Sequence, residues 1–112
     1  MPAYRLTPAA QADLIEIRQF TLQQWDAGQS QKYLSDIRNT IRLLAETPTL
    51  GKLCPDLGKD ILRFPQGSHV IYYVEHEQQL VAFGVLHKRM VPLGHLRAGE
   101  DLMRVKRKPL DI

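Results

Sequence analysis

The pattern of apolar and polar positions changes from a helical period to a strand period near the middle of the chain. Residues 3–6 alternate as a short edge strand does, and Thr7-Pro8 then supplies residues preferred at a helix N-cap and first turn. Apolar positions next recur in steps of three and four, which predicts a helix ending at Gly28. Its expected buried face consists of Ala10, Leu14, Ile17, Thr21 and Trp25, widened by Ile15 and Phe20.

A second helix is predicted from near Ser30 to Thr47, because Pro48 pushes the residue before it out of the helical region. Its expected apolar face consists of Leu34, Ile37, Ile41 and Leu44, with Tyr33 and Ala45 beside it. The connection between the two helices is so short that they must pack as antiparallel neighbours.

After a loop at 49–59, the apolar pattern takes the period of β-strands. Strands are predicted at 61–64, 69–74 and 80–86, with turns at 65–68 and 75–79. Short turns join these strands into an antiparallel meander. The last two are apolar at nearly every position, so we expect them at the centre of the sheet with both faces at least partly covered. The predicted fold class is α+β, in the order β-α-α-β-β-β, with a helical hairpin packed on a mostly antiparallel sheet.

Charge is distributed unevenly along the 112 residues. Residues 1–86 carry 8 Lys and Arg against 9 Asp and Glu, whereas residues 87–112 carry 7 against 3, so the net charge of +3 arises in the last quarter. We expect one domain at 1–96 and a basic tail at 97–112. Such a tail either attracts nucleic acid or an acidic protein, or is a solvated terminus.

The sequence argues against several classes of site. The single Cys54 excludes an internal disulfide and a Cys-based zinc site, and the four His residues have no metal-ligand spacing. No Gly-rich phosphate loop follows a strand, so we expect neither a metal nor another cofactor. No apolar run approaches the roughly 20 residues of a membrane-spanning helix, and no signal peptide opens the chain, which favours a cytoplasmic protein without membrane contact.

The most informative feature is the junction at the end of the last predicted strand. An apolar strand runs directly into the cluster His87, Lys88, Arg89 and Met90. Arg binds carboxylate or phosphate through two parallel hydrogen bonds, and Lys acts as a point charge. We therefore interpret residues 87–90 as a rigidly held contact surface for a partner macromolecule. His87 is either part of that surface or a strand-end side chain bonded to the backbone.

The order of elements coincides with short motifs spread over residues 3–96. They stand at residues 4–10, 13–14, 17, 25, 28, 33, 44–45, 48–51, 69–73, 85–90 and 95–96. Together they resemble the ParE branch of the RelE/ParE toxin superfamily, which consists of small bacterial toxins encoded beside an antitoxin. The resemblance implies the toxin of a type II toxin–antitoxin system that inhibits DNA gyrase and is neutralised by its cognate antitoxin in a hetero-oligomer. It implies no enzymatic activity and no sequence-specific nucleic-acid binding.

The superfamily also contains RelE-type toxins that cleave messenger RNA on the ribosome, and such an endoribonuclease is the alternative function. A nuclease needs a proton-transfer group and phosphate-binding cations, for which His87, Arg63 and Arg89 are the candidates. RelE-type nucleases typically place a Tyr near the end of the last strand, and this chain has no Tyr after Tyr73. We therefore favour a ParE-type toxin in which residues 87–90 contact gyrase.

Three side chains are candidates for contact with the antitoxin. Arg63 is either an ordinary outward strand residue or a partner for an acidic antitoxin segment. Trp25 is either packed in the core or an interface anchor, since Trp is enriched at binding hot spots. Tyr72 and Tyr73 point to opposite faces of one strand, so we expect one in the core and one at a partner surface, and we assign Tyr73 to the antitoxin.

Overall fold

The first helix begins where the sequence predicts it. In the computed structural model, which describes residues 3–90 and 92, helix α1 spans Pro8–Gln24. The side chain of Thr7 caps it by accepting a backbone hydrogen bond of 3.1 Å, and Pro occupies the first turn. The helix ends earlier than predicted, because the backbone is already extended at Trp25.

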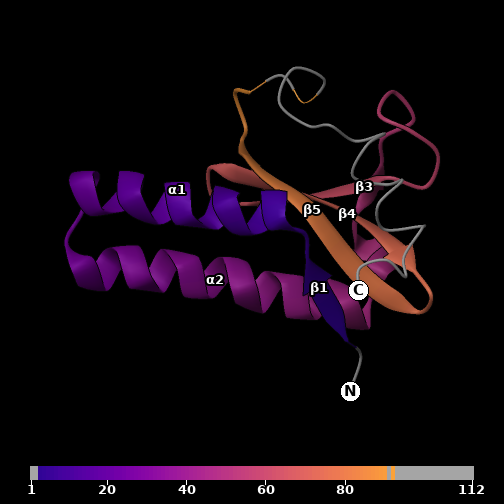
Figure 1. Ribbon diagram of the computed structural model, residues 1–112, viewed down its shortest axis with the longest axis horizontal. Coiled ribbons are helices and arrows are strands. Elements are labelled where there is room, and N and C mark those ends of the chain that lie inside the picture. Colours follow the sequence, from indigo (N-terminus) through magenta and orange to yellow (C-terminus); the bar gives the residue numbers. More distant parts are fainter. Residues whose placement is uncertain (1–2, 91, 93–112) are drawn as a thin grey trace.

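Helix α2 spans Ala27–Glu46, so Gly28 lies inside the second helix and does not end the first. Asp26 is the N-cap, and its carboxylate accepts a 2.7 Å hydrogen bond from a backbone N–H of the first turn. The predicted boundaries at Gly28 and Ser30 are therefore wrong, because the Asp cap already satisfies the start of α2. The two helices run side by side and antiparallel, and their connection projects beyond the sheet (Figure 1).

The helix faces that pack on the sheet are largely those predicted. Helix α1 buries Ala10, Leu14, Ile17 and Thr21, and α2 buries Ser30, Leu34, Ile37, Ile41 and Leu44. The widening of the α1 face is wrong, since Ile15 and Phe20 are each 58% exposed. Trp25 is also not a core residue, because it lies at the tip of the hairpin and is 37% exposed. Helix α1 thus buries a narrow stripe and keeps apolar side chains on both flanks.

The strands form one five-stranded sheet in the order β1-β5-β4-β3-β2 (Figure 1). They are β1 (Tyr4–Leu6), β2 (Lys52–Leu53), β3 (Leu62–Gln66), β4 (His69–His76) and β5 (Gln79–His87). Strand β1 pairs in parallel with β5, and the other neighbours are antiparallel. The predicted α+β class, the edge position of the first strand and the three-stranded meander are confirmed.

Two details of the sheet differ from the prediction. Pro65 and Gln66 continue strand β3, and only Gly67-Ser68 form the turn to β4. Pro is tolerated there because β2 pairs with β3 only at residues 62–63, so the outer edge of β3 is open at Pro65. The predicted loop at 49–59 also contains regular structure, namely β2 and part of the 3-10 turn η1 (Pro48–Leu50).

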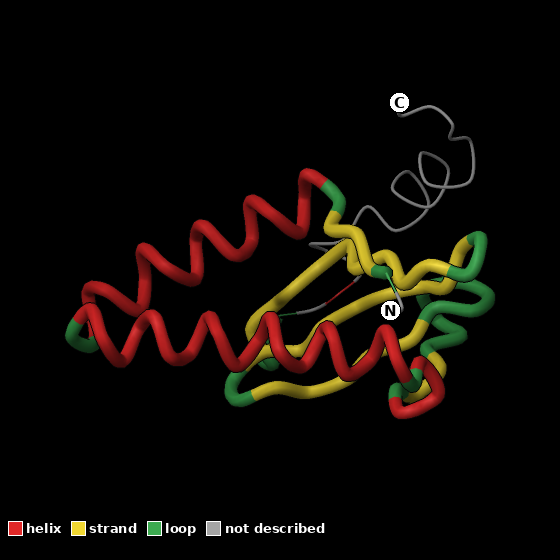
Figure 2. Tube along the Cα trace, turned by 90° about the horizontal axis from the view of Figure 1, so that it is seen from below, coloured by secondary structure: helices red, strands yellow, loops and turns green. Residues whose placement is uncertain are grey.

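Both faces of the central strands are covered, as predicted. The helical hairpin packs on one face over a cluster that includes Ile71, Tyr73 and Val85 (Figure 2). The other face carries Ile61, Tyr72, Val74, Val81, Phe83 and Leu86, with Cys54 and Leu57 of the β2–β3 connection packed against it. The basic tail predicted at 97–112 lies outside the described residues.

Candidate functional site

A β-bulge in the middle of β5 places His87 on the side of the sheet that faces the helices. Two consecutive residues of β4 pair with Ala82 and Gly84, so Phe83 is an extra residue in β5. Ala82 and Val85 therefore both pack under the helices although they are three positions apart. His87 follows Val85 by two positions and lies on the same face.

The predicted contact cluster lies in the turn after β5, and its backbone is held by hydrogen bonds. The N–H of Lys88 donates to the carbonyl oxygen of Ser68, and the N–H of Met90 donates to that of His87, both at 2.9 Å. The N–H of Arg89 donates to Nδ1 of His87 at 3.1 Å. His87 is half-buried, whereas Lys88, Arg89 and Met90 are exposed. A fixed backbone therefore presents three mobile side chains to a partner.

A row of four rings connects this turn with the tip of the helical hairpin. Trp25 contacts Tyr33 edge to face, with ring centroids 5.4 Å apart. Tyr33 in turn lies 5.6 Å from His69, and His69 lies 5.5 Å from His87, both in T-shaped geometry. The sequence gives no indication that these four rings form a row, because no local pattern shows that Tyr33 contacts His69.

The centre of this ring row is a hydrogen-bonded Tyr–His pair. The hydroxyl of Tyr33 lies 2.6 Å from Nδ1 of His69, and it accepts a 3.0 Å hydrogen bond from the N–H of Ser68. Burial, with His87 as a smaller cause, lowers the pKa of His69 from 6.5 to about 4. Burial likewise raises the pKa of the Tyr33 hydroxyl. At neutral pH the pair is therefore uncharged and suited to fixing the shape of this region.

The end of β5 forms a cleft with helix α1. Its volume is about 440 Å³, and its helix wall consists of Asp13, Glu16, Ile17 and Phe20. The opposite wall consists of His69, Val85, Leu86, His87 and Met90. The carboxylate of Asp13 accepts a 2.9 Å hydrogen bond from the N–H of Val85, which fastens the helix to the strand. Nothing local in the sequence indicates this contact between Asp13 and β5.

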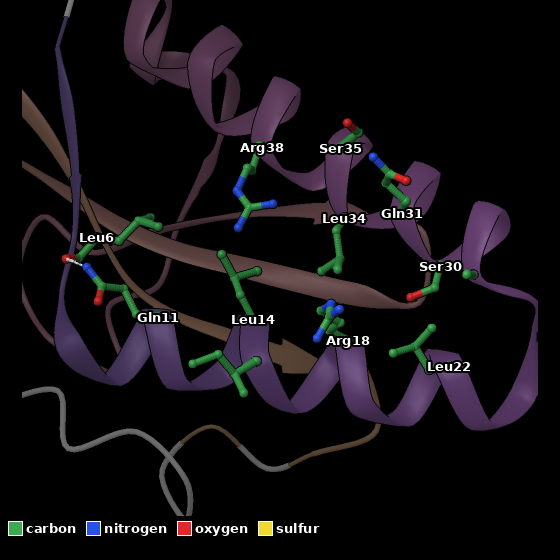
Figure 3. Close-up of a pocket in the computed structure, with 12 residues that line it drawn as sticks. Leu6, Gln11, Leu14, Arg18, Leu22, Ser30, Gln31, Leu34, Ser35 and Arg38 are labelled. Atoms are coloured by element: carbon green, nitrogen blue, oxygen red, sulfur yellow. Dashed lines mark hydrogen bonds between the residues drawn. The ribbon is translucent and has the colours of Figure 1, made fainter.

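A second hollow, the interhelix groove, runs between α1 and α2 and has a volume of about 810 Å³ (Figure 3). Leu14 and Leu34 form its apolar base, and Ile15 and Leu22 are exposed beside it. Arg18 from α1 and Arg38 from α2 are among the side chains that line it (Figure 3). None of the described residues that line it is Asp or Glu, so this part of the chain makes the groove apolar and cationic.

The remaining candidates lie apart from the turn after β5. Tyr73 is fully buried, and its hydroxyl donates a 2.6 Å hydrogen bond to the carbonyl oxygen of Pro48. The expectation that one of the two Tyr residues is exposed is wrong, because Tyr72 is buried as well, on the opposite face of the sheet. Arg63 is exposed and pairs in register with Tyr72, so it lies on the sheet face away from the helices and from His87.

Within residues 3–90 and 92, no three side chains of His, Cys, Asp or Glu gather as metal ligands would. The helices of this part of the chain are also not long and apolar enough to cross a membrane. The Cys54 thiol is a free cysteine whose pKa is raised mainly by burial. A raised pKa leaves less thiolate at neutral pH, which fits a thiol without a nucleophilic role.

Comparison with known proteins identifies the family. Residues 4–92 match the family described as ParE toxin of type II toxin-antitoxin system, parDE. Toxin ParE1 of Mycobacterium tuberculosis is 35% identical over 88 residues, which cover 78% of this chain and 90% of the relative. Toxin ParE1 of Caulobacter vibrioides is 34% identical over 97 residues, covering 86% of this chain and 99% of the relative.

A solved structure has the same fold. A chain of the chromosomal ParDE TA system from P. aeruginosa superposes with a TM-score of 0.66 at 15% identity, covering 78% of this chain and 96% of that one. The fold and the sequence relatives agree, and the chain belongs to the ParE toxin family of type II toxin–antitoxin systems. The resemblance drawn from the sequence is confirmed.

Proposed function

We propose that this ParE-family protein inhibits DNA gyrase by binding it, without chemistry of its own, and that a cognate antitoxin neutralises it by direct binding. In this proposal the two partners use different surfaces. The turn at residues 87–90 contacts gyrase, and the interhelix groove receives a segment of the antitoxin in a hetero-oligomer. Both partners are cytoplasmic in this scheme.

The observation that carries the gyrase proposal is the exposed cationic turn held on a rigid strand end. Lys88 and Arg89 project from a backbone whose N–H groups are bonded to Ser68 and His87. Contact charges on a fixed backbone lose less conformational entropy on binding than charges on a free loop. The side chains of Arg89 and Lys88 suit an acidic surface, because both carry positive charge and Arg can bind a carboxylate with two hydrogen bonds.

The arrangement gives little support to the alternative function as an endoribonuclease. The residues considered for such a site were His87, Arg63 and Arg89. Arg63 lies on the face of the sheet opposite to His87, so it is not placed to hold a phosphate beside that imidazole. Nδ1 of His87 is also engaged as the acceptor for the N–H of Arg89. Proton transfer requires groups within hydrogen-bond reach of one reacting centre.

The interhelix groove supports the antitoxin proposal through its chemistry. It combines an apolar base at Leu14 and Leu34 with Arg18 and Arg38, and no carboxylate of residues 3–90 and 92 lines it. Among the residues described, Arg18 and Arg38 form no ion pair. An amphipathic segment with an apolar side and acidic residues matches such a groove. Of the earlier antitoxin candidates, Trp25 and Arg63 remain exposed, whereas Tyr73 is unavailable to a partner unless the core opens.

A supercoiling assay with purified gyrase tests the main proposal. The full chain should inhibit supercoiling, and the variant K88A/R89A should inhibit at least about tenfold less, as expected for loss of contact residues. The variant R5A/R42A is a matched control, because it removes the same charge from exposed positions outside the turn. Full gyrase activity at large toxin excess would contradict the proposal.

Expression in cells distinguishes the proposal from the alternative. Growth should stop without the antitoxin and continue with it, and the arrested cells should show DNA damage before translation declines. In a translation extract the wild-type chain should leave messenger RNA intact. Cleavage of messenger RNA that is abolished by His87→Ala would instead establish the endoribonuclease.

A further inference from the structure

The cleft between α1 and the end of β5 has a rigid frame. Strand β1 pairs with β5 only as far as Ala82, and beyond that point α1 lies against the edge of β5. Asp13 fastens the helix there through its 2.9 Å hydrogen bond with the N–H of Val85. The cleft, of about 440 Å³, is therefore formed in the unbound chain, and a ligand would not have to order a loop to enter it.

The charged helix residues that line the cleft are carboxylates, although the turn beside it is cationic. They are Asp13 and Glu16, and among residues 3–90 and 92 no Lys or Arg lines the cleft. His69 contributes no positive charge at neutral pH, because burial holds its pKa near 4. Glu16 is exposed, and no cation in residues 3–90 and 92 pairs with it. Within the described part of the chain, Glu16 thus presents an unpaired carboxylate beside apolar surface.

The apolar part of the cleft has a buried base and exposed rims. Ile17 and Leu86 are each 6% exposed, whereas Phe20 on one rim is 58% exposed and Met90 on the other is 41% exposed. Phe and Met are enriched in the buried core of protein interfaces. An aromatic face beside a carboxylate favours a ligand group that is both flat and cationic.

We propose that this cleft receives an arginine side chain of the target protein, with its methylene stem between Phe20 and Met90 and its guanidinium paired with Glu16. Arginine suits the site better than lysine, because its planar group stacks on an aromatic ring and still donates two hydrogen bonds to a carboxylate. The inference rests on the proposed function in one respect. Met90 and His87 belong both to the cleft and to the turn proposed to contact gyrase, so one partner would cover both.

Two exposed substitutions test the proposal in the supercoiling assay. Glu16→Gln removes the charge and keeps the shape, and Phe20→Ala removes the stacking surface. Each should weaken inhibition about tenfold, which corresponds to about 1.4 kcal/mol of binding free energy. The matched controls are Glu46→Gln, at another exposed helix position, and Leu43→Ala, at an exposed apolar position of α2 that lines neither the cleft nor the interhelix groove. Both controls should inhibit within about twofold of the wild type.

Salt dependence and antitoxin binding make the test specific for a cationic partner. The difference in inhibition between the wild type and Glu16→Gln should become smaller at high salt, because salt screens the charge pair in the wild type. If Phe20→Ala weakens inhibition and Glu16→Gln does not, the occupant is apolar and the arginine proposal is wrong. Unchanged inhibition in both variants, or loss of antitoxin affinity with inhibition intact, overturns it as well.

Failure of the gyrase proposal would be recognised separately. If the wild type does not inhibit gyrase, the same variants are scored for growth arrest in cells without the antitoxin. Loss of arrest in Glu16→Gln and Phe20→Ala, with arrest retained in both controls, would support the cleft as the contact site for a different target. Arrest retained in all four variants would overturn the cleft proposal independently of the target's identity.

Discussion

The two flanks of helix α1 differ in charge although both are built around apolar side chains. One flank carries Ile15, Arg18 and Leu22 and lines the interhelix groove, where the charged groups are cationic. The other flank carries Glu16 and Phe20 and lines the cleft with β5, where the charged groups are carboxylates. A single helix therefore offers surfaces of opposite charge to its two sides.

Because of this difference in charge, one small domain can bind two protein partners on separate surfaces. Complementary charge raises association with the right partner, and like charge disfavours the wrong one. An acidic segment that fits the groove would be repelled by the carboxylates of the cleft. The buried stripe of α1 separates the two surfaces, so substitutions on one flank should leave the other unchanged.

A substitution that weakens the packing of the helical hairpin on the sheet should have the largest effect on stability, because both the groove and the cleft depend on this packing. Ile41 is fully buried in the cluster beneath the helices. Ile41→Ala should cost about 2–5 kcal/mol of unfolding free energy, measured by denaturant titration. Leu43→Ala, at a position 47% exposed on the same helix, should cost less than about 0.5 kcal/mol. Equal losses would mean that the face of α2 is misassigned.

Acid should destabilise the folded chain through His69, which lines the cleft. His69 has a folded-state pKa near 4 against 6.5, so below about pH 6.5 the unfolded chain binds a proton that the folded chain does not. The contribution of His69 to the unfolding free energy is fully present above about pH 6.5. It decreases as the pH falls and is lost below about pH 4. The total loss is about 3 kcal/mol. Thermal melts from pH 7.5 to 4 should show it, and His69→Asn should reduce the slope; parallel curves would contradict the assignment.

Reversal of the groove charges should separate the two proposed partners. The variant R18E/R38E should lower antitoxin affinity on the order of 100-fold, because it places like charges opposite an acidic segment. Gyrase inhibition by the free toxin should stay within about twofold. Titration calorimetry gives the affinity, and R42E/K59E is a control with the same change of net charge outside the groove. If this control weakens antitoxin binding equally, long-range charge and not the groove determines recognition.

Detachment of α1 from β5 should produce the smallest of these effects and should be local. Asp13→Ala leaves the N–H of Val85 without its carboxylate acceptor, at a cost of about 1–3 kcal/mol. Hydrogen exchange at that amide should accelerate. Asp36→Ala breaks an exposed ion pair with Lys32 and should cost at most about 1 kcal/mol. An unchanged exchange rate at Val85 would show that the strand edge is protected without Asp13.

Sequence reasoning located the elements better than it located their ends. The apolar stripe reaches Trp25 and Gly28 follows soon after it, so the sequence predicts a helix up to Gly28, although Asp26 already caps the next helix. Strand alternation correctly placed Tyr72 and Tyr73 on opposite faces, but it did not indicate that each face is covered. Exposure depends on which distant segment packs there, and alternation carries no information on that.

The candidate site was predicted in part. The turn at 87–90 follows from a local contrast between apolar strand and cationic cluster, and the structure places three of its side chains in solvent. The cleft was not predicted, because its walls come from Asp13, Phe20, His69 and His87, which no local motif connects.

The sequence by itself determined the order of elements, the buried stripes of both helices and the family, since these depend on local periodicity and short motifs. Tertiary structure alone decided which side of the sheet His87 occupies, through the extra residue Phe83 in β5. It also decided the hydrogen bond between Asp13 and Val85, 72 positions apart, and the Tyr33–His69 pair, 36 positions apart. Such contacts depend on how strands pair and helices dock, and these long-range choices leave no periodic signal along the chain.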